Sequence, residues 1–104
     1  MIITTSDTIA GKTVKESKGL VRGNTIRARH MGHDFMASLR GVVGGEITDY
    51  TKMLAESREQ AIDRMIEEAE SLGANAIVCL RFSTSMIMQN AAEILAYGTA
   101  VVME

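Results

Sequence analysis

Apolar residues recur every three or four positions between Thr48 and Leu72, which is the period of an α-helix with one buried face. Thr48 or Asp49 can cap the start of this helix, and Gly73 can end it. We predict an amphipathic helix of about 24 residues, roughly 36 Å long. Its apolar stripe contains Leu54, Ala61, Ile62, Met65, Ile66, Ala69 and Leu72, and its acidic face contains Glu56, Glu59, Asp63, Glu67 and Glu70.

Segments rich in Val, Ile and Thr lie before and after this helix and predict β-strands. We expect bulges at Gly19 and Gly23 and a turn over residues 10–12. A short helix is expected over residues 34–40, where Phe35, Met36, Leu39, Val42 and Val43 share one face. The expected strands cover residues 2–5, 13–17, 20–29, 76–82 and 93–103.

The last predicted strand is apolar on both faces, which is unusual for a two-layer domain that covers one side of its sheet. On one face of this strand the small residues Ala96, Gly98 and Ala100 would allow the helix to approach the sheet closely. No second helical layer remains for the other face, so we expect another subunit to cover it. One face carries Ile94, Ala96, Gly98, Ala100 and Val102, and the other carries Leu95, Tyr97, Thr99, Val101 and Met103.

Several short sequence motifs resemble those of the YbjQ-like family of small proteins, whose biochemical role is not established. The resemblance implies a two-layer α+β fold with a mostly antiparallel sheet, a short helix and one long helix on one face. It also implies a dodecin-like subunit that assembles as a ring-shaped homopentamer. The matching motifs and residues are Thr4-Thr5, Gly11, residues 19–23, Asp34-Phe35, residues 38–40 and 43–45, Tyr50, and residues 57–59, 73–78 and 98–102.

Composition narrows the class of protein further. The 104 residues are sufficient for one domain, which we expect to span residues 1–104. No apolar run approaches the roughly 20 residues of a membrane span, no signal peptide is evident, and a single cysteine excludes an internal disulfide. We therefore expect a cytoplasmic protein without a membrane partner.

Charge is distributed unevenly around the net value of −2. Residues 1–40 hold seven Lys and Arg against three acids, whereas residues 41–104 hold four against ten. Both halves can simply expose their charges to water, or the basic strands of one subunit can meet the acidic helix of another. Nucleic-acid binding is not expected, because the protein is acidic and has few aromatic residues to stack bases.

His30 and His33 are three residues apart and could chelate a metal, with Cys79, Met86 or Met88 as soft ligands for Cu(I) or Zn. Families of this kind are sometimes labelled heavy-metal-binding. However, nothing in the sequence brings a third ligand to the His pair, and a cysteine within an apolar strand is usually an inert small hydrophobe. We therefore commit to no metal site or cofactor and keep heavy-metal binding as an alternative.

Tyr50 and Arg58 are eight residues apart on one face of the long helix, two turns along, and Glu46 precedes them. A phenol and a guanidinium could hold an anionic or polar ligand at a subunit junction. The alternative is that Arg58 pairs with Glu46 or a neighbouring acid, and that Tyr50 packs in an interface.

Catalytic patterns are weak, since no nucleophile-elbow serine or phosphate-loop spacing is present. We expect a non-catalytic homo-oligomeric binding or interaction module, with a small ligand between subunits. The alternatives are a metal-handling protein and an enzyme of unknown reaction that uses Tyr50 and Arg58.

Overall fold

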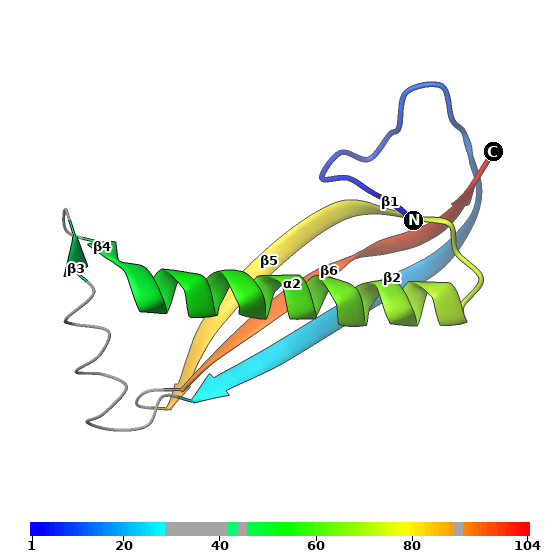
Figure 1. The fold of residues 1–104 in the computed structure, drawn as a ribbon. Helices are drawn as coiled ribbons and strands as arrows, with labels where there is room; N and C mark the ends of the chain where they lie inside the picture. The colour runs from blue at the N-terminus through cyan, green and yellow to red at the C-terminus, as the bar shows by residue number, and fades with distance from the viewer. Residues whose placement is uncertain (29–41, 44–45, 89–90) are drawn as a thin grey trace.

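Long antiparallel strands and one long helix form the described part of the protein (Figure 1). The structure is a computed structural model that describes residues 1–28, 42–43, 46–88 and 91–104. Side chains are described for residues 1–27, 52–88 and 91–104. The elements are β1 (Ile2–Ile3), β2 (Val14–Ala28), β3 (Val42–Val43), β4 (Glu46–Ile47), α2 (Thr48–Ser71), β5 (Ala76–Met88) and β6 (Ala91–Met103).

The main sheet has the strand order β1-β5-β6-β2. β6 lies in its centre and pairs antiparallel with both β5 and β2, while the short β1 pairs parallel with the start of β5. The predicted α+β class and the mostly antiparallel sheet are therefore confirmed. β3 and β4 form a separate two-stranded sheet before the helix.

The strands differ in length from those predicted. β2 is continuous from Val14 to Ala28, and β5 continues to Met88, beyond the predicted end at residue 82. The segment FSTSMIM has three polar residues in a row followed by three apolar ones, without the alternation of a strand, and antiparallel pairing with β6 extends the strand through it. Val42 and Val43 lie in β3, so their assignment to the face of a short helix is wrong, while residues 34–40 lie outside the described residues.

The long helix is confirmed as predicted, with 24 residues in α2. Ala61, Met65 and Ala69 are completely buried against the sheet, and the five predicted acidic residues are exposed. Leu72 is wrong as a stripe residue, because the helix ends at Ser71 and Leu72 is exposed. In the part of the chain that is described, no helix is both long and apolar enough to cross a membrane.

The helix is offset toward one side of the sheet. It packs mainly on β2, less on β6, and makes little contact with β5 (Figure 1). The registers place Phe82 beside Ala96 and Met86 beside Ala92, on the side of the sheet that carries the helix. Because α2 lies away from β5, both side chains are exposed, Met86 by 73%.

Gly23 of β2 is the point of closest approach between helix and sheet. Its pairing with Ala96 continues the ladder without a shift, so the predicted bulge at this position is wrong. A methyl group here would collide with the backbone of Ala61 and Met65. The predicted bulge at Gly19 is confirmed by a register shift between Ser17 and Gly19.

The face of the sheet away from the helix is covered in part by the N-terminal segment. Ile9 packs on a cluster of buried residues at that end of the sheet, so another subunit is not needed there as we had expected. Leu95, Tyr97 and Thr99 remain half-buried further along the same face. The buried residues of this cluster are Ala76, Val78, Val101 and Met103.

The molecule is elongated, with principal extents of 51 × 26 × 16 Å. Its radius of gyration is 16.9 Å, whereas a compact domain of this length has about 13 Å. The far ends of β2, β5 and β6 converge at one end of the long sheet (Figure 1). Exposed apolar side chains gather there, contributed by Ile26, Phe82, Met86, Ile87 and Met88.

Candidate functional site

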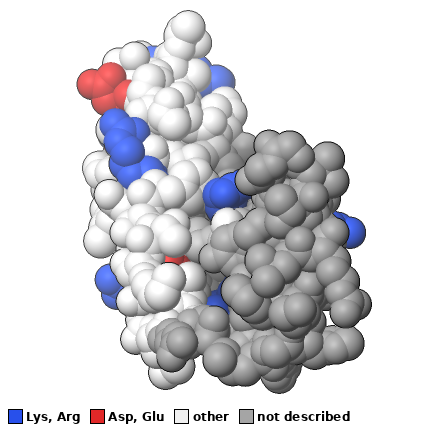
Figure 2. Space-filling view, turned by 90° about the vertical axis from the view of Figure 1, so that its left-hand side faces the viewer, with Lys and Arg blue, Asp and Glu red and all other residues white. Residues whose placement is uncertain are grey.

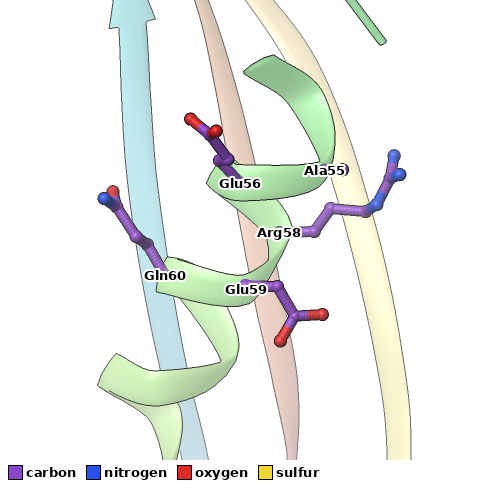
Figure 3. A pocket seen from close by; sticks show the side chains of 5 residues that line it. All are labelled: Ala55, Glu56, Arg58, Glu59 and Gln60. Carbon is purple, nitrogen blue, oxygen red and sulfur yellow. The ribbon is translucent and has the colours of Figure 1, made fainter. Parts of the chain in front are cut away.

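Arg58 lies in an open hollow on one turn of α2 (Figure 3). The hollow has a volume of about 450 Å³ and is also lined by Ala55, Glu56, Glu59 and Gln60. In the close-up, the guanidinium of Arg58 extends to the β5 side of the helix, while Gln60 points to the β2 side. The site therefore presents one cation beside two carboxylates and an amide, all open to solvent.

Hydrogen bonds from β2 fix this turn of the helix. Arg27 Nε donates to Ser57 Oγ over 2.7 Å, and Arg27 Nη2 donates to Gln60 Oε1 over 2.6 Å. Thr25 Oγ1 donates to the Ser57 carbonyl over 3.2 Å, and Ser57 Oγ donates to the Met53 carbonyl over 2.9 Å. Ser57 is completely buried, so the position of Arg58 next to it is set by a buried, satisfied group.

The predicted ligand-binding residues are placed only in part. Arg58 is exposed, and within the described residues no salt bridge involves it. Tyr50 lies in the first turn of α2 and Glu46 in β4, but their side chains lie outside the described residues. Whether the three side chains meet is therefore still a prediction.

The soft ligands of the predicted metal site lie in two places along β5. Cys79 lies near the start of this strand, and Met86 and Met88 lie at its far end. At about 3.3 Å per residue Cys79 and Met86 are about 23 Å apart, too far to share an ion. His30 and His33 lie outside the described residues. Among the residues that are described, no three His, Cys, Asp or Glu side chains form a group that could hold a metal.

Cys79 itself is half-buried and has a positive φ of 57°, which is uncommon for a residue other than glycine. It lies within the register shift between Val78 and Arg81, and its amide donates to the Ser6 carbonyl. These contacts give Cys79 a structural role in attaching the N-terminal segment to β5.

Sequence reasoning missed Arg27, Ser57 and Gln60 as the residues that position this turn. A signal was present, because Ser57 is four residues before Ala61 and therefore on the same stripe of the helix. A small polar residue within an apolar stripe requires a hydrogen-bond partner when it is buried.

Figure 2 looks onto the left-hand side of the view in Figure 1. Between its grey parts it shows a wide area that belongs to neither acidic nor basic side chains, with more Lys and Arg than Asp and Glu around it.

Comparisons with known proteins identify the family. Residues 1–104 match the family YbjQ_1, described as "Putative heavy-metal-binding". A UPF0145 protein of Methanosarcina acetivorans is 62% identical over 101 residues, covering 97% of this chain and 95% of that one. A UPF0145 protein of Dehalococcoides mccartyi strain BAV1 is 58% identical over 104 residues, covering 100% of both.

The fold agrees with a solved structure as well. A protein of unknown function from Pediococcus pentosaceus, assigned to the DUF74 family, has a TM-score of 0.70 and is 19% identical. The alignment covers 100% of this chain and 98% of that one. The chain is thus an α+β protein of this fold. It belongs to the uncharacterised UPF0145 family, also called YbjQ-like, which confirms the resemblance found in the sequence.

Proposed function

We propose that the protein is a homo-oligomeric binding module, with five copies in a ring, that holds a small anionic or polar ligand at the junctions between subunits. The observation that carries the ligand part is the exposed Arg58 in its hollow, on the turn of α2 that the buried Ser57 ties to β2. A guanidinium offers five donors in a planar fork that matches a carboxylate or phosphate. Tyr50 and Glu46 are the proposed additional contacts from the start of the helix.

Three features support assembly. The radius of gyration exceeds that of a compact domain of this size, β5 is left uncovered by the helix, and large apolar side chains are exposed at one end of the sheet. Exposed apolar patches of this kind mark interaction sites. The count of five subunits comes from the resemblance to the YbjQ-like family, and the molecule functions in the cytoplasm in this proposal.

Two alternatives use other chemistry. The description of the family favours heavy-metal binding, and in this chain His30 and His33 are the candidates, with either Cys79 or Met86 and Met88 as soft ligands. An enzyme of unknown reaction at Tyr50 and Arg58 is the other alternative. A metal protein would bind stoichiometric Zn or Cu when purified without a tag, and would lose it in a His30→Ala, His33→Ala double variant.

Native mass spectrometry of the wild type, Arg58→Ala and Lys12→Ala tests the proposal. Lys12 is an exposed lysine in a turn and provides a matched loss of one positive charge. We expect an assembly with a retained small molecule in the wild type and in Lys12→Ala. Arg58→Ala should keep the assembly and its Tm, because an exposed Arg contributes little to folding, but should lose the ligand. Ligand retention in Arg58→Ala would contradict the proposed site.

A further inference from the structure

The two outer edges of the long sheet are alike at the end where the strands converge. From Leu20 to Ala28, β2 pairs with β6 without any shift in register. From Arg81 to Met86, β5 pairs with β6 on the other side, also without a shift. In the described part of the chain, no strand pairs with the outer side of either segment. Each segment therefore presents a regular row of backbone N–H and C=O groups to its surroundings.

The opposite ends of the same two strands are protected. On β2, register shifts interrupt the ladder after Val14 and after Ser17, and such irregularities discourage edge pairing. On β5, the N-terminal segment occupies the edge. β1 pairs with the first residues of the strand, and the Cys79 and Leu80 amides then donate to the carbonyls of Ser6 and Thr4. Within the described residues, the regular parts of the two strands, residues 20–28 and 81–86, are free at the other end, and β5 has a further register shift only between Met86 and Met88.

The side chains of the β5 segment lack the usual devices against edge pairing. Residues 82–88 contain neither a charged residue nor a proline, and they combine β-branched, aromatic and methionine side chains. The same segment is exposed along its whole length. On the β2 segment, Ile26 is 58% exposed although it lies in a regular strand. A monomer in water would present the uncharged β5 edge to any passing chain, whereas the β2 edge carries Arg22 and Arg27 beside the exposed Leu20 and Ile26.

The offset of the helix supplies the second observation. α2 covers β2 but leaves the same side of β5 open, with Phe82 and Met86 uncovered. If the β2 segment of another copy pairs at the β5 edge, the helix of that copy arrives beside the open side of β5. This single contact between copies would then both satisfy the backbone hydrogen bonds of the β5 edge and cover Phe82 and Met86.

We propose that residues 20–28 of β2 in one copy pair with residues 81–86 of β5 in the next copy, so that the sheet continues from subunit to subunit. The two segments differ in sequence, so the contact is heterologous and generates a closed ring when the rotation between copies is suitable. A foreign extended peptide could satisfy the backbone of one edge. However, only a second copy of this chain offers both edges, at the same end and of similar length.

This inference deepens the proposed function and rests on it. Thr25 of β2 donates a hydrogen bond to the Ser57 carbonyl. Across the sheet, Thr25 is paired with Ile94, and Ile94 is paired with Thr84 of β5. The helix turn that carries Arg58 is therefore at the same height as the unpaired part of β5. Arg58 extends to the β5 side of its helix, and Gln60 extends to the β2 side (Figure 3). The pairing therefore brings Arg58 of one copy toward the Gln60 side of the next helix. The ligand site would lie between two helices.

Amide hydrogen exchange of the wild-type assembly, resolved by NMR for each residue, tests the pairing. An unpaired edge strand has amides that alternate between bonded and solvent-facing, so exchange alternates between slow and fast. We expect slow exchange at every amide of residues 20–28 and 81–86. An assembly whose exchange alternates along these segments would overturn the pairing and leave the proposed oligomer intact. A monomeric wild type would overturn both the pairing and the proposed oligomer. Edge amides that become protected only when an extended peptide is added would overturn both as well.

Two variants test whether the contact is heterologous. Met86→Lys and Ile26→Lys place a charge on one edge each, and Leu72→Lys is the control at an exposed apolar residue away from both edges. We expect each edge variant to be monomeric, a mixture of the two to form a dimer through the intact edges, and Leu72→Lys to keep the wild-type mass. The inference is overturned if Ile26→Lys assembles normally, or if the mixture remains monomeric at concentrations where the wild type is assembled.

Discussion

Gly23 of β2 lies directly beneath Ala61 of α2, with no room for a side chain between strand and helix. A methyl group on Gly23 would collide with the Ala61 carbonyl oxygen and the Met65 amide nitrogen, and would lie 2.8 Å from Arg64 Cβ. Backbone atoms in the middle of a helix cannot move independently. The contact therefore sets the distance between the two layers, and with it the position of the turn that carries Arg58.

We expect Gly23→Ala to lower the free energy of unfolding by about 1–3 kcal/mol, because the added methyl pushes the helix away from the sheet. Urea denaturation followed by circular dichroism measures the change. Asn24→Ala is the control on the adjacent exposed residue and should change stability by no more than about 0.5 kcal/mol. Equal stability of the two variants would show that the layers adjust without difficulty.

Ser57→Ala should cost about 1–3 kcal/mol, because it removes a buried hydroxyl and leaves Arg27 Nε without its acceptor. Ser71→Ala is the matched control, since that hydroxyl donates to the Glu68 carbonyl at the exposed end of the same helix. Thermal unfolding should show a clearly lower Tm for Ser57→Ala alone. A similar Tm for both variants would remove the argument that Ser57 fixes the site.

Asn75 extends the sheet with its side chain. Its Nδ2 donates to the Met103 carbonyl over 2.9 Å, and its Oδ1 accepts from the Met103 amide over 2.8 Å. We expect Asn75→Ala to destabilise the protein by about 1–2 kcal/mol and to speed amide exchange at Met103. Unchanged exchange at Met103 would show that these bonds contribute little in solution.

Val101→Glu should be among the most damaging single changes. Val101 is 2% exposed in the cluster with Ala76, Val78 and Met103, where a carboxylate has no partner. The expected loss is about 3–5 kcal/mol, which unfolds the subunit or dissociates the assembly. Leu72→Glu, at an exposed position, is the control and should fold normally. A folded Val101→Glu protein with the wild-type Tm would contradict the assigned core.

Much of the fold could be predicted because local signals agree with the tertiary structure. The spacing of Ala61, Met65 and Ala69 and the glycine at position 73 determined both the face and the length of α2. The end of β5 could not be found in this way. Its outer part has three polar residues in a row followed by three apolar ones, which is not a strand pattern, and only pairing with β6 decides that it remains a strand.

The candidate site was predicted less completely, because it depends on contacts between distant parts of the chain. Arg58 was identified from its place on the helix, but its support by Arg27 comes from β2, thirty residues earlier. Likewise, a bulge was predicted at Gly23, because a glycine in a strand signals either a bulge or a close approach of another backbone. Only the position of α2 shows that the close approach is the reason for this glycine.

The mass of the protein in solution tests the central claim most directly. Light scattering of the wild type over a dilution series from micromolar concentration upward measures how many 11.3 kDa chains associate. The account predicts a single species of five chains, with the mass constant over the series because the ring is closed. A different constant multiple would contradict only the number five. A mass of 11.3 kDa throughout would contradict the assembly, the pairing of β2 with β5 and the ligand site between subunits.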